Sequence, residues 1–170
     1  MSRVFIGLGS NMGDRERNIT DAVRLMMERF TFVRMSSIYE TAAMYHPQQP
    51  DFLNAVVLVE TGILPISLLN ILLDIEKNIG RVRTFKNAPR TIDLDILFYD
   101  DLVVDLPELK IPHPLMCERR FVLEPLVEIA GEVMHPVLGK SVHQLDLPCQ
   151  QVNLYKSRKK INLHAATNHA

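Results

Sequence analysis

Two carboxylates, Asp93 and Asp95, stand two residues apart in the segment "TIDLDILFYDD". The segment alternates as a half-buried strand does, so both carboxylates share one face and lie roughly 6.6 Å apart along the chain. Such a pair can bind one or two Mg²⁺ ions, which prefer oxygen ligands. A solvated polar strand face is the alternative interpretation. The alternation predicts one face with Ile92, Leu94, Ile96 and Phe98, and another with Asp93, Asp95, Leu97 and Tyr99.

A basic segment, "GRVRTFKNAPR", precedes the acid pair and contains no acid. Guanidinium groups beside metal-binding carboxylates suit a nucleoside triphosphate, because cations and metals together neutralise its phosphates. The segment is then a loop that closes over a nucleotide, and a solvated basic loop is the alternative. Its basic residues are Arg81, Arg83, Lys86 and Arg90. The familiar phosphate-binding motifs are absent, and Gly7, Gly9 and Gly13 indicate only a tight turn.

Phe52 and Asn54 share a face of another predicted strand, "FLNAVVLVE". An aromatic ring beside an amide that both donates and accepts hydrogen bonds suits a flat heterocycle with polar edges. The alternative is structural: Phe52 packs under the preceding proline-rich loop and Asn54 satisfies a backbone group. Phe121 is equally ambiguous, because it also fits the apolar face of a predicted helix.

The composition limits the classes of protein that the chain can belong to. It has 170 residues, 47% of them hydrophobic, and 19 Lys and Arg against 20 Asp and Glu. This length predicts one domain, over residues 1–149, followed by a polar, basic C-terminal tail over 150–170. The near balance of charge gives no general attraction to nucleic acid or membrane. Neither a signal peptide nor a membrane span is evident, and two cysteines make no disulfide framework, so we expect a cytoplasmic protein.

The order of predicted elements gives the fold class. It is strand, helix, strand, strand, helix, strand, which predicts an α+β, ferredoxin-like βαββαβ core with an antiparallel sheet, helices on its faces and a C-terminal extension. The first two helices should cover one face and leave the other available. A further helix is expected over Cys117–Ile129. The expected core elements are Val4–Leu8, a helix capped by Asp14, Phe32–Glu40, Phe52–Glu60, a helix over Pro65–Ile79 with Gly80 as its cap, and the acid-pair strand.

Four segments together resemble one enzyme family: "GLGSNMGD", "QPDFLNAVV", "GRVRTFKNAPRTIDLDILFYDD" and "IPHPLMCERRFVLEPLVEIA". They are similar to 6-hydroxymethyl-7,8-dihydropterin pyrophosphokinase of folate biosynthesis, over roughly Val4 to Pro136 and in the family's order. The resemblance implies a ferredoxin-like enzyme, 2-amino-4-hydroxy-6-hydroxymethyldihydropteridine diphosphokinase. Such an enzyme transfers the terminal pyrophosphoryl group of ATP to the pterin hydroxymethyl group and leaves AMP.

The resemblance also implies roles for particular residues. Asp93 and Asp95 match the ligands of two Mg²⁺ ions. The positions that match the pterin site are Thr41, Met44, Phe52, Asn54 and Phe121. Those that match the ATP phosphates and the closing loop are Arg81, Arg83 and Arg90, which we assign to catalysis, with His113 and Arg119 as nucleotide-binding residues and Glu76 also in the nucleotide site. Ser10 and Asn11 match the first catalytic loop. Many members have tryptophan and glycine where this chain has Asn87 and Ala88, and some have tyrosine at Pro114.

Such a site would work by positioning and charge neutralisation. The pterin oxygen attacks the β-phosphorus while Mg²⁺ lowers its pKa and Arg83 and Arg90 stabilise the developing charge. His113 suits a phosphate hydrogen bond or acid–base work. The expected partners are ATP and the pterin, with no nucleic acid or membrane, and a monomer is expected. Two alternatives are an RNA-binding module of the same topology and a non-catalytic small-molecule sensor.

Overall fold

The computed structural model describes residues 1–43, 48–80, 86 and 89–155. Short 3₁₀ turns at Met116–Glu118 and Val142–Gln144 flank the third helix. The helices and strands of the described residues are β1 (Ser2–Ser10), α1 (Arg15–Met27), β2 (Thr31–Met35), β3 (Tyr39–Thr41), β4 (Phe52–Thr61), α2 (Pro65–Asn78), β5 (Asp93–Tyr99), β6 (Val104–Asp105), β7 (Lys110–Ile111), α3 (Arg120–Ala130) and β8 (Asn153–Leu154).

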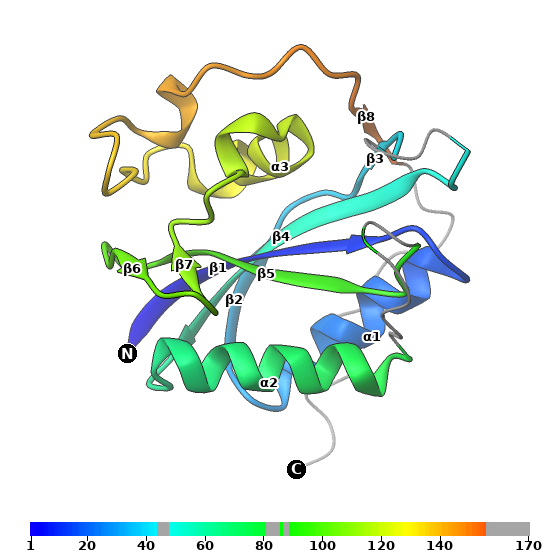
Figure 1. The fold of residues 1–170 in the computed structure, drawn as a ribbon, viewed down its shortest axis with the longest axis horizontal. Coiled ribbons are helices and arrows are strands. Elements are labelled where there is room, and N and C mark those ends of the chain that lie inside the picture. Colours follow the sequence, from blue (N-terminus) through cyan, green and yellow to red (C-terminus); the bar gives the residue numbers. More distant parts are fainter. Residues whose placement is uncertain (44–47, 81–85, 87–88, 156–170) are drawn as a thin grey trace.

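A six-stranded antiparallel sheet forms the centre of the molecule, in the order β5-β1-β4-β3-β8, with β2 also paired to β4. The strand β1 is therefore flanked by β4 and β5 along most of its length. The helices α1 and α2 lie on one side of the sheet and α3 on the other (Figure 1). This arrangement confirms the predicted ferredoxin-like core.

The predicted helix ends are confirmed in detail. The Asp14 side chain accepts a hydrogen bond from the backbone N–H of Arg17 at 3.1 Å, as an N-cap does. Pro65 occupies the first turn of α2, where a missing N–H costs nothing. Gly80 follows the end of α2 with φ of 93°, a left-handed conformation that favours glycine.

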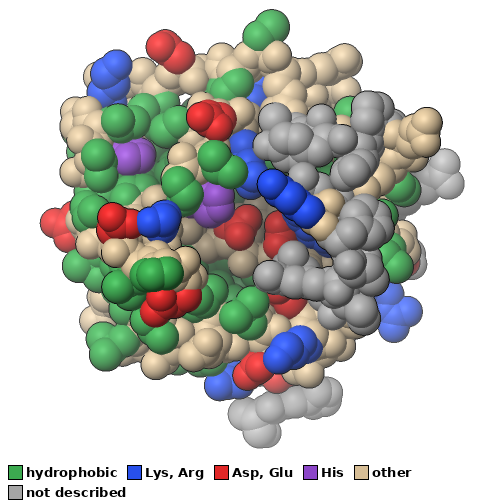
Figure 2. Space-filling view, viewed as in Figure 1, with side chains coloured by type: hydrophobic (Ala, Val, Ile, Leu, Met, Phe, Trp, Pro, Cys, Tyr) green, Lys and Arg blue, Asp and Glu red, His purple; other side chains and the backbone are tan. Residues whose placement is uncertain are grey.

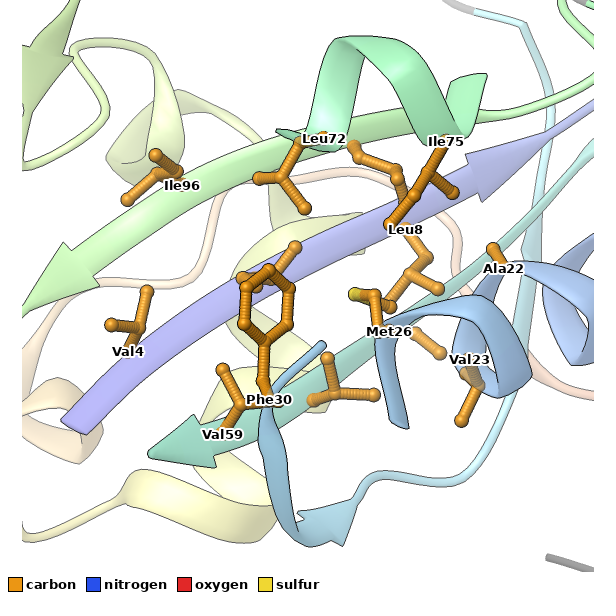
Figure 3. Close-up of a cluster of buried hydrophobic side chains, with 14 of the residues drawn as sticks. Val4, Leu8, Ala22, Val23, Met26, Phe30, Val59, Leu72, Ile75 and Ile96 are labelled. Carbon is orange, nitrogen blue, oxygen red and sulfur yellow. The ribbon is translucent and has the colours of Figure 1, made fainter. Parts of the chain in front are cut away.

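The larger hydrophobic core fills the space between the sheet and the helices α1 and α2 (Figure 3). The strands contribute every second residue and the helices contribute residues three or four apart, which is why the periodicity of the sequence predicted these elements. Side chains at the centre of this core include Val4, Leu8, Ala22, Val23, Met26, Phe30, Val59, Leu72, Ile75 and Ile96.

A second core lies on the opposite face of the sheet, under α3, so the prediction that this face is left available is wrong over much of its area. Leu123 and Leu126 of α3 are fully buried against Val56 and Leu58 of β4. The remaining part of this face, beside the N-terminal end of α3, stays accessible. The predicted third helix begins later than expected, at Arg120, because Met116–Glu118 form a 3₁₀ turn.

The alternation predicted for the acid-pair strand fails after Leu97. A β-bulge places Phe5 opposite Phe98 and Ile6 opposite Ile96, so Leu97 is the extra residue. Phe98 therefore joins Leu97 in the core under α3, and Tyr99 joins the core under α1 and α2. Asp93 and Asp95 precede the bulge, so their side chains remain on the predicted face of the strand.

The strand predicted over Phe32–Glu40 is interrupted, giving β2 and β3. The Ser36 hydroxyl accepts the Val56 N–H at 2.9 Å, and the Ser36 N–H donates to the Val56 carbonyl. A side-chain oxygen thus replaces a backbone acceptor in the ladder and lets the chain bend. As a result, β2 pairs with the C-terminal half of β4 and β3 with its N-terminal end.

Part of the expected C-terminal tail belongs to the sheet. β8 pairs with β3, and the Tyr155 N–H donates to the Ile38 carbonyl at 2.9 Å. Both residues of β8 are nevertheless exposed, so the predicted polar tail over 150–170 stays a prediction, and positions 156–170 lie outside the described residues. Within the described part of the chain, no helix has the length and apolar character needed to cross a membrane.

Candidate active site

A pocket opens on the face of the sheet that α3 leaves accessible. Figure 2 shows acidic and basic side chains beside a histidine in a hollow near the middle of the molecule. β1, β3, β4, β5 and the start of α3 all contribute to its lining. Eight of the residues predicted from sequence line it: Thr41, Phe52, Asn54, Arg90, Asp93, Asp95, Arg119 and Phe121.

Asp93 and Asp95 enter this pocket from β5, on the face opposite Leu94. Desolvation, followed by repulsion from Asp93, raises the pKa of Asp95 above the usual carboxyl value, and Arg119 opposes this rise. The Asp95 side chain nevertheless keeps 37% of its surface accessible, so a ligand can reach it. Arg90 pairs with Asp93, with 3.1 Å between Nη1 and Oδ2.

The chemistry of this donor set fits a hard divalent cation. The described residues contain no group of three His, Cys, Asp or Glu side chains placed to hold a metal. An ion at Asp93 and Asp95 would therefore take its other ligands from water and substrate oxygens, as Mg²⁺ commonly does. A bound cation would stabilise the ionised form of Asp95, which the metal-free pocket disfavours.

His113 lies beside the acid pair, with Nε2 at 4.0 Å from Oδ1 of Asp95. Burial and the nearby Arg119 lower the pKa of His113 to about 4, so the ring is neutral at pH 7 and this contact is no ion pair. The Leu115 N–H donates to Nδ1 at 3.2 Å, which assigns the ring proton to Nε2. His113 therefore presents a hydrogen-bond donor toward the acid pair.

Two aromatic rings line the pocket from different elements, Phe52 from β4 and Phe121 from α3. Each ring has a guanidinium group close to it. The Cζ atom of Arg90 lies 6.0 Å from the centre of the Phe52 ring, and that of Arg119 lies 5.7 Å from the centre of the Phe121 ring. Each aromatic ring of the pocket therefore has a cationic group beside it.

Asn54 lines the same pocket from β4, two residues after Phe52, and is 4% exposed. Its Nδ2 atom has no hydrogen-bond partner among the described residues, which is costly for a buried amide. Thr41, also 4% exposed, donates from its hydroxyl to the Gln151 carbonyl at 3.2 Å and so joins the pocket wall to the C-terminal segment. Asn54 therefore has spare hydrogen-bonding capacity for a ligand.

Asn11 ties three segments together at the edge of the pocket. Its Oδ1 accepts the Arg90 N–H at 2.7 Å, and its own N–H donates to the Arg90 carbonyl at 3.0 Å. Its Nδ2 donates to Oε1 of Gln49 at 3.1 Å. Ser10 is linked to α1 through the amide of Asn18. The segment predicted as a catalytic loop thus holds Arg90 in place.

Some predicted site residues lie elsewhere. Glu76 is buried between α2 and β5, outside the pocket lining, where its Oε1 accepts the Leu94 N–H at 2.9 Å. Its assignment to the nucleotide site stays a prediction. Met44, Arg81 and Arg83, like Asn87 and Ala88, lie outside the described residues.

Sequence reasoning missed Gln49 and two glycines of the pocket. Gly7 and Gly9 belong to β1, and the interpretation of these two as turn residues is wrong. Their alternation with Ile6 and Leu8 was the available signal, because a strand with apolar residues on one face and glycines on the other has a bare face. Gly13, with φ of 70°, does lie in a turn.

Comparison with known proteins is consistent with this geometry. The family model for 7,8-dihydro-6-hydroxymethylpterin-pyrophosphokinase (HPPK) matches residues 5–131. The 2-amino-4-hydroxy-6-hydroxymethyldihydropteridine pyrophosphokinase of Aquifex aeolicus is 40% identical over 144 residues, which cover 85% of this chain and 90% of that protein. The corresponding protein of Bacillus subtilis is 43% identical over 131 residues, 76% of this chain and 78% of that one.

Other relatives are much longer than this chain. The folic acid synthesis protein fol1 of Pneumocystis carinii is 45% identical over 140 residues, which cover 82% of this chain and only 19% of that protein. The chain thus spans about a fifth of the length of such relatives. A crystal structure of Plasmodium falciparum HPPK-DHPS with pteroate shares the fold, with a TM-score of 0.70, 18% identity, and coverage of 85% and 41%. With its family match over residues 5–131 and relatives at 40% identity or more, the chain belongs to the HPPK family.

Proposed function

We propose that this chain transfers a pyrophosphoryl group from ATP to the hydroxymethyl group of 6-hydroxymethyl-7,8-dihydropterin, giving AMP and the pterin pyrophosphate. The observation that carries the proposal is the content of a single pocket. Asp93 and Asp95 line it together with Phe52, Asn54 and Phe121. A metal-binding carboxylate pair and a site for a flat polar heterocycle are the two halves that this reaction requires.

The pterin ring is assigned to the half of the pocket between β4 and α3. Phe52 and Phe121 supply aromatic surface for its faces, and Asn54 supplies an amide whose Nδ2 lacks a partner among the described residues. A buried amide favours a ligand with complementary donors and acceptors over an apolar one, because the unsatisfied group would otherwise remain costly.

The triphosphate is assigned to the half that contains the acid pair. Mg²⁺ bound by Asp93 and Asp95 would neutralise phosphate charge and polarise the attacking hydroxyl. Arg90 and Arg119 add positive charge at the pocket wall, and the Nε2–H of His113 can donate to a phosphate oxygen. A neutral His113 is a poor proton donor for catalysis at pH 7, so we assign it to phosphate binding. Arg81 and Arg83 remain proposed catalytic residues.

The cellular setting is proposed from the composition and from the reaction itself. We propose a cytoplasmic monomer whose partners are ATP and the pterin. The alternative of an RNA-binding module is disfavoured, because α3 packs on the sheet face that such a module uses to stack bases.

The proposed function is tested by the identity of the products. Incubation with ATP, Mg²⁺ and the hydroxymethyl dihydropterin should yield AMP and the pterin pyrophosphate in equal amounts, because attack occurs at the β-phosphorus. Omission of the pterin and chelation of Mg²⁺ are the controls, and each should abolish AMP formation. ADP as the main nucleotide product, or no turnover of this pterin, would reject the proposal.

A further inference from the structure

One row of three residues crosses the floor of the pocket. Gly9 of β1 pairs with Asn54 of β4 on one side and with Asp93 of β5 on the other. Residues directly opposite each other in neighbouring strands point to the same face. The row therefore runs from the proposed pterin-binding amide to the proposed metal-binding carboxylate, and its central residue has no side chain.

Space, rather than backbone conformation, explains the glycine at this position. Gly9 lies within a regular strand and is not among the glycines with positive φ. A Cβ atom built on Gly9 would lie 3.2 Å from Oδ1 of Asn54, which is tighter than an ordinary contact, and 3.6 Å from Cδ1 of Phe52. Two of the three side chains assigned to the pterin ring, Asn54 and Phe52, thus lie against the bare backbone of Gly9.

Gly7 provides an internal comparison, because it lies on the same strand and the same face. The three atoms nearest to a Cβ atom on Gly7 would all belong to the Leu97 side chain, at 3.6 Å or more, which is ordinary van der Waals contact. The tight contact with a ligand-binding side chain is therefore particular to Gly9.

We infer that Gly9 is a positioning residue for the pterin site: its missing side chain sets where the Asn54 amide lies and keeps the floor clear between that amide and Asp93. The inference rests on the proposed function, because it gives Gly9 its effect through the side chain that recognises the ring. A methyl group at Gly9 would displace the amide by a few tenths of an ångström, enough to misalign its hydrogen bonds to a bound heterocycle.

A double-mutant cycle tests this inference. Pterin affinity in the absence of nucleotide, ATP affinity and melting temperature are measured for Gly9→Ala, Asn54→Ala and the double variant. Gly9→Ala should weaken pterin binding about tenfold and leave ATP binding unchanged. In the Asn54→Ala background the same methyl should change pterin affinity by no more than about twofold, since the amide it displaces is gone.

Two further glycine variants serve as controls. Gly62→Ala adds a methyl in the β4–α2 connection, where nothing lies within 4 Å, and should leave both affinities unchanged. Gly7→Ala should weaken pterin binding less than Gly9→Ala does. These variants separate the particular effect of Gly9 from the general effect of adding a methyl group.

Five results would overturn the inference. Undiminished pterin affinity in Gly9→Ala would do so, as would a full additive loss in the Asn54→Ala background. A fall in melting temperature that is the same in both backgrounds, with no pterin-specific loss, would assign Gly9 to the fold alone. If Gly9→Ala failed to fold, recovery of folding in the double variant would support the clash with Asn54, and failure of both would refute it.

Normal pterin affinity in Asn54→Ala would instead reject the proposed ring site, and with it the role of Gly9.

Discussion

Asp95 carries a charge that the metal-free protein does not favour. Its carboxylate is desolvated and lies near Asp93 and Glu76, and both carboxylates raise its pKa. Asp95→Asn should therefore leave the melting temperature unchanged or raise it, because a like-charge repulsion is removed. Turnover should fall by about a thousandfold, since phosphate neutralisation contributes several kcal/mol to the transition state. Thermal unfolding and steady-state kinetics measure the two effects.

Asp101→Asn is the matched control for this change. Asp101 is exposed in the turn after β5, so its replacement should alter neither the melting temperature nor the rate. If Asp95→Asn melted well below the parent and retained near-normal Mg²⁺-dependent activity, the carboxylate pair would have a structural role and no role in metal binding.

Asn11 links the backbone of Arg90 to the rest of the pocket, and it is completely buried. Asn11→Ala removes the acceptor of the Arg90 N–H and leaves that donor without its partner, at a cost of about 1 to 3 kcal/mol. We expect the free energy of unfolding to fall by this amount and kcat to fall as Arg90 loses its position. Chemical denaturation and kinetics measure these effects. Asn70→Ala, at an exposed position of α2, should change neither, and an equal loss there would remove the special role of Asn11.

The helix α3 is joined to the edge of the sheet by one carboxylate. Oε1 of Glu128 accepts the Ser37 N–H at 2.9 Å and the Ser37 hydroxyl at 2.8 Å, and Oε2 accepts the Tyr39 hydroxyl at 2.7 Å. The start of α3 carries Phe121 and β3 carries Thr41, so these bonds fix the two walls of the pocket relative to each other.

Glu128→Ala should lower the free energy of unfolding by about 1 to 2 kcal/mol, because three hydrogen bonds at a largely exposed site are lost. Pterin affinity should fall with it, as α3 loosens from β3. Denaturant unfolding and pterin titration measure these changes. The nearby Glu132→Ala is the control, since the Glu132 side chain is 93% exposed. A pterin site unaffected by Glu128→Ala would show that α3 is held by its hydrophobic core alone.

The turn after α3 contains a histidine that must stay neutral. Nδ1 of His135 accepts the N–H groups of Val137 and Leu138, and burial lowers the pKa of the ring below its usual value near 6.5. A base whose folded-state pKa is depressed contributes stability above its unfolded pKa, and this stability is lost as pH falls. The contribution of His135 to the free energy of unfolding should therefore decrease from about pH 6.5 downward.

His135→Gln should flatten this decrease, because the variant has no group to protonate in the turn. Denaturant unfolding at several pH values between about 5 and 8 makes the comparison. The same acid-side slope in parent and His135→Gln would refute the contribution of His135.

The molecule as a whole shows which features local sequence patterns can predict. Asp14, Pro65 and Gly80 mark helix ends by their own conformational and hydrogen-bonding preferences, so their roles were predictable. The pairing of Asp93 and Asp95 was predictable for the same reason, because strand alternation fixes their common face. These features depend on residues close together in the chain.

Features that depend on distant segments were not predictable in this way. The bulge at Leu97 exists only in the pairing of β5 with β1, and the break at Ser36 depends on Val56 of β4. Whether α3 covers the second face is decided by packing between segments about 70 residues apart, such as Val56 and Leu126. The role of Gly9 as the floor of the pocket likewise appears only when three strands are aligned.

The central claim is that one pocket holds the pterin between Phe52 and Phe121 and the metal-bound triphosphate at Asp93 and Asp95. A crystal structure with Mg²⁺, the hydroxymethyl dihydropterin and an unreactive ATP analogue tests it most directly. The account predicts the ring against both aromatic side chains, its polar edge on Asn54, and metal density at oxygens of both Asp93 and Asp95. A pterin bound outside this pocket, or a metal ion bound away from the acid pair, would contradict it.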